Sequence, residues 1–235
     1  MYVITDRRTN ISALASLNRL GFEVIQMQSA EYLQQGVSSH ADMLLFFGFG
    51  KIFCHKRYYE ANREPIDRIC AISHHSLILS DEPTGAKYPL DVLFNACLVG
   101  NKLICNEKTV SRLILEAARG WGCKIINVPQ GYTKCSICVV SDDAIITADK
   151  AITAACRGAK IDVLEVSEGH ISLPPYDYGF IGGASGLCGD KVYFCGSLDS
   201  HPDGERIEEF CLKHKKNAIS LTSGELQDVG SLFFI

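Results

Sequence analysis

The sequence has no apolar run long enough to cross a membrane. A membrane-spanning helix needs about 18 or more consecutive, mostly apolar residues, and polar residues interrupt every apolar stretch here well below that length. The opening residues, MYVITDRR, also lack the basic-then-apolar order of a secretory signal. We therefore expect a cytoplasmic protein that has no membrane partner.

The sequence also lacks an excess of positive charge and any cofactor motif. Its 23 Lys and Arg residues against 27 Asp and Glu give a net charge of −4, which offers no electrostatic basis for binding nucleic acid. The glycine-rich segment 179–186 has neither the lysine of a P-loop nor the glycine order of a dinucleotide-binding loop. It is interpreted either as a bulge or tight bend in a strand, or as a place where the backbone closely approaches a ligand. We expect neither a cofactor nor a metal ion.

Cysteine, in contrast, is abundant, and its 11 copies are an odd number. Most of them stand among apolar residues, which is typical of cysteine acting as a small buried hydrophobe. Without a secretion signal, a reducing compartment is favoured over a disulfide framework. Cys135 and Cys138 have the spacing of a redox or zinc pair, but no second ligand pair accompanies them, so metal binding is not favoured.

One short pattern recurs about five times along the chain. It consists of an apolar run, a turn and a second apolar segment, and it occupies residues 40–54, 90–105, 134–149 and 176–194. The fifth copy begins at Gln227 and stops at Ile235, and residues 1–6 resemble the missing second half. Because joining the two ends would leave no free strand edge, the split copy predicts a closed ring.

A predicted helix and strand precede most copies of the pattern. The predicted helices cover 10–20, 57–70, 109–119, 150–156 and 203–214, and the strands that follow them cover 22–27, 75–79, 124–128, 161–166 and 217–221. The resulting units of about 40 to 50 residues are 7–56, 57–107, 108–149, 150–197 and 198–235 together with 1–6. The alternative is an ordinary α/β sandwich whose buried strands simply look alike. The split fifth unit favours one domain built as a five-fold α/β propeller.

Five such units in a ring, with the two chain ends sharing one unit, resemble the pentein superfamily. That superfamily includes arginine deiminases, dimethylarginine dimethylaminohydrolases, amidinotransferases and a ribosome-binding initiation factor. Segments 130–135 and 179–186 are similar to those of a bacterial branch for which the resemblance implies no particular reaction. The resemblance covers essentially the whole chain and rests on the order of the units.

The resemblance implies a cysteine nucleophile in the last unit, a His-x-Asp pair and carboxylates that hold a guanidinium group. The nucleophile would fall near Ser231, where the chain has no cysteine. A serine without a base is a much poorer nucleophile than a thiolate, and the sequence shows no base beside Ser231. His40 and Asp42 match the His-x-Asp pattern, although they lie in the first unit rather than in the unit that the enzymes use.

Aligning the units places five residues at equivalent positions, where a loop enters a core strand: Asp42, Asp91, Cys135, Asp177 and Asp228. In a five-fold ring these positions face one axis, so the side chains should meet at one mouth of a central channel, where ligand sites are favoured. The alternative is that each Asp only caps a turn. Gathered carboxylates would attract a guanidinium or amine cation, and Glu225 in the last unit is a further candidate for this set. Cys135 is expected on a strand, so the adjacent Lys134 need not face it.

Two functions remain open. The first is a pentein-like protein that binds a small cationic ligand, or a macromolecular partner, without catalysis, and the missing terminal cysteine favours it. The alternative is a guanidine-modifying hydrolase or amidinotransferase with Cys135 as a displaced nucleophile and His40 as its acid or base. His201 is interpreted either as a turn residue before a helix or as an acid or base near the channel mouth.

Overall fold

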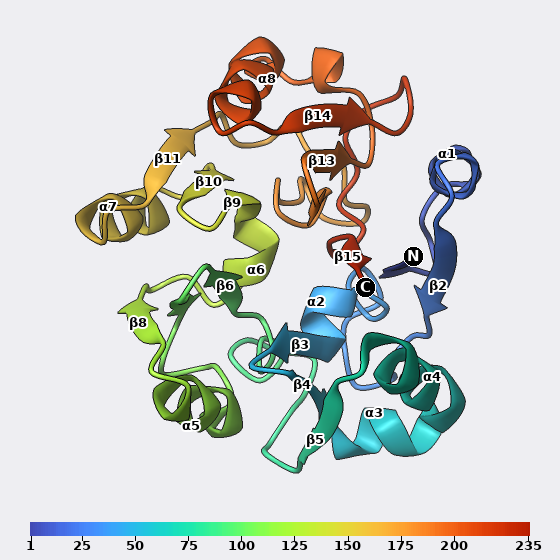
Figure 1. The fold of residues 1–235 in the computed structure, drawn as a ribbon. Helices are drawn as coiled ribbons and strands as arrows, with labels where there is room; N and C mark the ends of the chain where they lie inside the picture. The colour runs from blue at the N-terminus through green and yellow to red at the C-terminus, as the bar shows by residue number, and fades with distance from the viewer.

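The computed structural model describes residues 1–235 and shows five three-stranded sheets arranged in a ring (Figure 1). The strands in chain order are β1 (Tyr2–Asp6), β2 (Glu23–Met27), β3 (Leu45–Gly48), β4 (Lys51–His55), β5 (Ser76–Ser80), β6 (Cys97–Val99), β7 (Lys102–Cys105), β8 (Lys124–Asn127), β9 (Cys138–Ser141), β10 (Ala144–Thr147), β11 (Asp162–Glu165), β12 (Ser185–Cys188), β13 (Lys191–Phe194), β14 (Asn217–Ser220) and β15 (Phe233–Phe234).

All five sheets share one connectivity. An inner strand pairs antiparallel with a middle strand, as β3 does with β4, and the middle strand pairs parallel with an outer strand, as β4 does with β5. A tight turn joins the inner and middle strands in four of the sheets, whereas in the fifth these two strands are the two ends of the chain. Parallel neighbours need a crossover, and helices supply it on the outside of the ring (Figure 1).

The helices of the whole chain, of which α2 and α6 directly precede inner strands and the others lie in the crossovers, are α1 (Ile11–Arg19), α2 (Ala41–Leu44), α3 (Lys56–Ala61), α4 (Arg63–Ser73), α5 (Arg112–Gly120), α6 (Thr133–Ser136), α7 (Lys150–Gly158) and α8 (Gly204–Lys213).

The two ends of the chain close the ring, as the split fifth unit predicts. Strand β1 is the middle strand of its sheet, with β15 on one side and β2 on the other. Val3 pairs with Phe234 and Ile4 with Phe233, and the backbone N–H of Tyr2 donates to the carbonyl oxygen of Ile235 at 2.8 Å. The five-fold α/β propeller is therefore confirmed.

The sheets are staggered relative to the residue ranges expected for the units. Each sheet takes its inner and middle strands from one range and its outer strand from the next, as β3 and β4 lie in 7–56 and β5 lies in 57–107. The stagger arises because the crossover helix begins each expected range but connects two strands of the preceding sheet.

Most of the crossover helices follow the predicted ranges, and side-chain caps begin several of them. Asn10 accepts a hydrogen bond from the N–H of Ala13 before α1, and Ser111 accepts one from Leu113 before α5. The prediction of one helix over 57–70 is wrong, because the chain breaks at Asn62 into α3 and α4. Pro65 then lies in the first turn of α4, where a missing N–H costs nothing.

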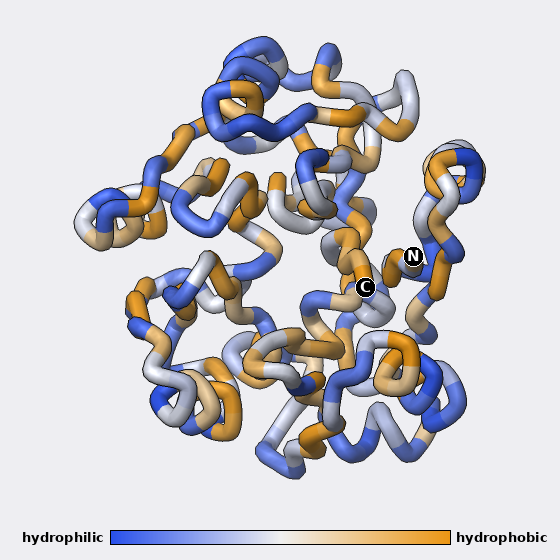
Figure 2. Tube along the Cα trace, in the orientation of Figure 1, coloured by the Kyte–Doolittle hydropathy of each residue, from blue (hydrophilic) through white to orange (hydrophobic).

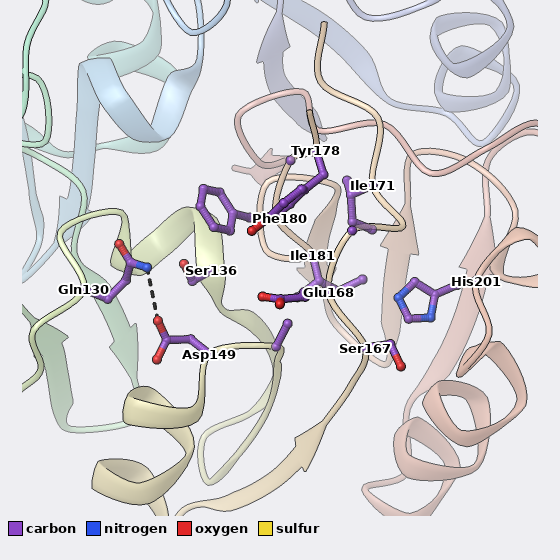
Figure 3. A pocket seen from close by; sticks show the side chains of 13 residues that line it. Gln130, Ser136, Asp149, Ser167, Glu168, Ile171, Tyr178, Phe180, Ile181 and His201 are labelled. Carbon is purple, nitrogen blue, oxygen red and sulfur yellow. Dashed lines mark hydrogen bonds between the residues drawn. The ribbon is translucent and has the colours of Figure 1, made fainter. Parts of the chain in front are cut away.

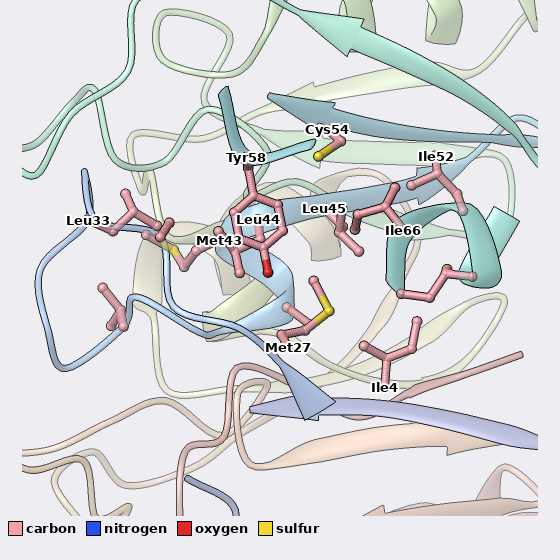
Figure 4. Close-up of a cluster of buried hydrophobic side chains, with 14 of the residues drawn as sticks. Ile4, Met27, Leu33, Met43, Leu44, Leu45, Ile52, Cys54, Tyr58 and Ile66 are labelled. Atoms are coloured by element: carbon pink, nitrogen blue, oxygen red, sulfur yellow. The ribbon is translucent and has the colours of Figure 1, made fainter. Parts of the chain in front are cut away.

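Five hydrophobic clusters fill the spaces between sheets and helices. The largest joins the first two sheets and contains Ile4, Met27, Leu45, Ile52 and Tyr58 (Figure 4). The hydropathy of the chain is mixed along each outer helix (Figure 2), as helices that cover a sheet with one face require. None of the helices has the length and apolar character that crossing a membrane would need.

Candidate functional site

Two helices of one turn each enter the centre of the ring (Figure 1). Helix α2 precedes inner strand β3 and carries Asp42, and helix α6 precedes inner strand β9 and carries Cys135. The expectation that Cys135 lies on a strand is therefore wrong. Four residues are too few to show a helical period, so the apolar pattern of the following strand dominated the sequence signal.

The glycine-rich segment lets the chain pass close to this centre. A Cβ atom on Gly182 would collide with the carbonyl oxygens of Lys134 and Ile137, and one on Gly183 would collide with the Asp228 carboxylate. The close approach that these glycines permit is therefore to α6 and to Asp228.

A cavity of about 360 Å³ opens at the mouth of the ring. Gln34, His40, Cys135, Asp177 and Asp228 form its polar part, and aromatic rings form much of the remaining wall. The complete lining is Gln34, Val37, His40, Tyr132, Cys135, Leu173, Tyr176, Asp177, Tyr178, Phe180 and Asp228. Neither a lysine nor an arginine is among these residues.

His40 is completely buried between two carboxylates. Its Nε2 lies 3.5 Å from Oδ2 of Asp6, and its Nδ1 lies 3.7 Å from Oδ1 of Asp228. Neither ring nitrogen has a hydrogen-bond partner. Burial raises the pKa of Asp6, but hydrogen bonds from Arg8 and the charge of His40 outweigh burial and leave this pKa below its usual value.

Asp228 is held by the backbone. Its carboxylate accepts hydrogen bonds from the N–H groups of Phe180 at 2.9 Å and Gly230 at 3.0 Å. Burial raises the pKa of Asp228, and the negative charge of Asp42 adds to that rise against the opposing effect of His40. The two carboxylates therefore repel each other, and a cation would relieve this repulsion.

Cys135 is fixed by Asn95, a buried side chain. The amide Nδ2 of Asn95 donates to Sγ of Cys135 at 2.9 Å, and its Oδ1 accepts from the backbone N–H groups of Lys134 at 2.7 Å and Cys135 at 3.2 Å. Burial raises the pKa of the Cys135 thiol well above its ordinary value, and Asp42 and Asp228 raise it further. The thiol is therefore protonated at neutral pH in the free protein.

Ser231 lies behind the cavity rather than in its wall. Its Oγ donates to Oδ2 of Asp42 at 2.7 Å, and Nζ of Lys134 donates to the same Oγ at 2.8 Å. Oδ1 of Asp42 is buried without a partner. Ser231 has no exposed surface, so its hydroxyl links an ammonium group to a carboxylate inside the protein.

A comparison with sequence models of protein families gives one match that covers almost the whole chain. The model is described as Family of unknown function (DUF6873), and it matches residues 4–233. The chain belongs to this family. No curated protein matches the sequence.

Solved structures with the same fold include enzymes whose names indicate guanidino substrates. DDAH from Pseudomonas aeruginosa, a mutant in complex with citrulline, covers 94% of this chain and 92% of its own at a TM-score of 0.62 and 8% identity. An amidinotransferase from Microseira wollei aligns over 93% of this chain and 87% of its own, with a TM-score of 0.55 and 8% identity. A C. jejuni agmatine deiminase with substrate bound aligns over 98% of this chain and 94% of its own, with a TM-score of 0.52 and 8% identity. These similarities show that the DUF6873 chain has the pentein fold.

The structure of this DUF6873 protein brings most of the sequence-predicted site residues together. His40, Cys135, Asp177 and Asp228 line the cavity, and Asp42 lies buried directly behind it. Asp91 is also buried and accepts a hydrogen bond from the hydroxyl group of Tyr132, a cavity residue, at 2.6 Å. Asp177 is exposed at the rim.

Glu225 does not join the other carboxylates. It lies in the loop after β14, it is exposed, and it is absent from the cavity wall. The backbone of this loop packs against Gly196, and the Glu225 residue is exposed.

Sequence reasoning missed three side chains that shape the site, namely Asp6, Asn95 and Tyr132, and it considered Lys134 only as a neighbour of Cys135. Asp6 had a signal, because it ends the segment 1–6 that completes the fifth repeat. Asn95 and Lys134 act across units, and no local pattern marks such contacts. Lys134 also supplies the cation beside Ser231 that the sequence did not reveal.

Proposed function

We propose that the central cavity binds a small organic cation of the guanidinium or amine type, and that binding involves no covalent step. The observation that carries this proposal is the negative charge around a cavity that no lysine or arginine lines. Asp177 and Asp228 face the cavity, and Asp6 and Asp42 lie behind it.

The aromatic wall supports the same ligand class. The rings of Tyr132 and Phe180 are stacked with centroids 6.0 Å apart, and Tyr176 and Tyr178 also line the cavity. Aromatic faces attract cations by about 0.5 to 2 kcal/mol each, depending on how far the cation is desolvated. A volume of about 360 Å³ lies at the lower end of the range for small-molecule pockets.

Arginine and citrulline provide the sharpest test. Arginine carries a charged guanidinium group, whereas citrulline carries a neutral urea group of nearly the same shape. We expect calorimetric titration to show binding of arginine or agmatine and at least tenfold weaker binding of citrulline. Asp177→Asn should weaken arginine binding by a factor of about 1.4 to 5, because an exposed ion pair contributes roughly 0.2 to 1 kcal/mol. Asp142→Asn is the matched control, since Asp142 is exposed in the turn after β9 and outside the cavity. Equal binding of arginine and citrulline would refute the proposal.

A second candidate function is a guanidine-modifying hydrolase or amidinotransferase, because His40 and Cys135 face the same cavity. His40 would take the proton of the Cys135 thiol, and the sulfur would attack the guanidinium carbon to form a C–S bond. The bond from this carbon to the departing amine would then break, and His40 would pass the proton to that amine. Water, or an acceptor amine, would then release the product and free the thiol.

The raised pKa of the Cys135 thiol makes this candidate testable without knowing the substrate. A guanidinium bound beside the sulfur would stabilise the thiolate, so iodoacetamide should modify Cys135 slowly in the free protein and faster with arginine present. Peptide mass spectrometry locates the modified cysteine, and Cys135→Ala identifies its signal. If arginine binds but neither accelerates alkylation nor yields a ureido product, the binding function stands and the enzymatic one fails.

A further inference from the structure

A second pocket, the His201 pocket, lies beside the central cavity (Figure 3). It has a volume of about 210 Å³, and the residues that line it include Gln130, Asp149, Glu168 and His201. Tyr178 and Phe180 also line the central cavity, so the two spaces share one wall.

His201 presents a hydrogen-bond donor to this pocket. Only 4% of the residue is exposed. Its Nδ1 accepts a hydrogen bond from the backbone N–H of Asp203 at 3.0 Å, so in the neutral ring the proton resides on Nε2. Nε2 makes no well-formed hydrogen bond, although the backbone of Ser167 lies near enough to His201 to raise its pKa against the effect of burial. Figure 3 shows the Nε2 side of the ring directed toward the interior of the pocket. A buried donor without a partner is costly in a folded protein, and a ligand acceptor would satisfy it.

Two carboxylates, Asp149 and Glu168, also line the pocket. Oδ2 of Asp149 accepts a hydrogen bond from Gln130 at 3.1 Å (Figure 3), and Oδ1 of Asp149 caps helix α7. Glu168 forms neither an ion pair nor a side-chain hydrogen bond within the chain, and neither a lysine nor an arginine lines the pocket. An anion would be repelled by these carboxylates, and a simple amine would leave the His201 donor unsatisfied.

We infer that the His201 pocket is a second ligand site, for a small molecule that carries a protonated amine next to a hydroxyl or carbonyl oxygen. The amine pairs with Glu168 and Asp149, and the oxygen accepts from Nε2 of His201. The low pKa of His201, which burial depresses, agrees with a neutral donor. This site does not depend on what the central cavity binds.

Three probes of similar size separate the two parts of this recognition. 2-Aminoethanol has both groups, propylamine lacks the oxygen, and ethylene glycol lacks the charge. In titrations followed by the ring ¹⁵N resonances of His201, 2-aminoethanol should shift the Nε2 resonance and bind at least fivefold more tightly than either of the other two. His201→Gln assigns the resonance.

The variants test the site without threatening the fold. Glu168→Gln changes an exposed side chain and should weaken 2-aminoethanol binding at least threefold, whereas Glu209→Gln on the exposed face of α8 should leave it unchanged. Cys135→Ala, which alters only the central cavity, should also leave it unchanged. The inference is overturned if propylamine binds equally well, if Glu168→Gln has no effect, or if acetate shifts His201 more than 2-aminoethanol does.

Discussion

Ser231 links two of the segments that form the site from a position behind the cavity. It has a φ angle of +69°, which is unusual for a residue other than glycine, and it has no exposed surface. Its hydroxyl joins Lys134 of α6 to Asp42 of α2, so three segments of the chain meet in one hydrogen-bonded chain of side chains. We regard the hydroxyl as a structural link, because it lies outside the cavity wall.

Ser231→Ala tests this link. Removing the hydroxyl leaves the Asp42 carboxylate and the Lys134 ammonium group without their common partner, so we expect a loss of roughly 1 to 3 kcal/mol in the free energy of unfolding. Urea denaturation measures the loss. Ser223→Ala, at an exposed position in the loop after β14, should change stability by less than about 0.5 kcal/mol. Equal effects of the two substitutions would show that the link contributes nothing.

At the residue scale, the sequence could identify candidates only where they stood in the repeated pattern. His40, Asp42, Cys135 and Asp228 were found in this way, and the structure places each of them in or directly behind the cavity. Lys134 and Ser231 are 97 residues apart, and their contact depends on how two sheets close the ring. Side-chain contacts between units leave no signal in one sequence.

At the scale of elements, the short helices α2 and α6 position the site, and the glycine-rich segment locks α6 in place. Long crossover helices such as α5 were predictable because their apolar residues recur at helical spacing over several turns. The one-turn helices were not predictable, because they are set by contacts such as the Asn95 side chain that holds the first turn of α6.

Gly182→Ala should displace α6 and weaken the central site. The added Cβ would meet carbonyl oxygens of α6, which are backbone atoms that cannot move independently of the helix. We expect a lower melting temperature and, in the folded protein, at least fivefold weaker arginine binding.

Gly158→Ala is the matched control, because a Cβ there meets no atom within 4 Å and the position ends helix α7. That change should be neutral or stabilising by up to about 1 kcal/mol. A Gly182→Ala protein with unchanged melting and binding would contradict the role of this segment.

At the scale of the whole molecule, the ring and its closure could be predicted because a repeat split across the termini implies a shared sheet. The assignment of strands to sheets could not, because the sequence order of helix, strand and loop does not show which neighbours pair. A further property extends over most of the ring: all 11 cysteines are free thiols, and they occur in or next to four of the five sheets, the exception being the sheet formed by β15, β1 and β2. Burial raises the pKa of seven of them from about 9 to about 11 or 12, namely Cys54, Cys97, Cys105, Cys138, Cys156, Cys195 and Cys211.

These thiols should make the fold sensitive to alkali. In the unfolded chain they ionise near pH 9, whereas in the folded protein they hold their protons to about pH 11. Above pH 9 the unfolded state therefore binds fewer protons, and the free energy of unfolding falls as the pH rises. Each thiol contributes about 1.4 kcal/mol per pH unit, so seven of them could remove roughly 10 kcal/mol by pH 10, comparable with a typical total stability.

Urea denaturation under reducing conditions should show constant stability from pH 7 to 8 and a steep loss between pH 9 and 10. A variant with Cys156→Ala and Cys211→Ala should start from a lower stability but show a shallower loss, because two of the seven thiols no longer ionise. A free energy of unfolding that is the same at pH 8 and pH 10 would show that the unfolded thiols do not control the alkaline limit.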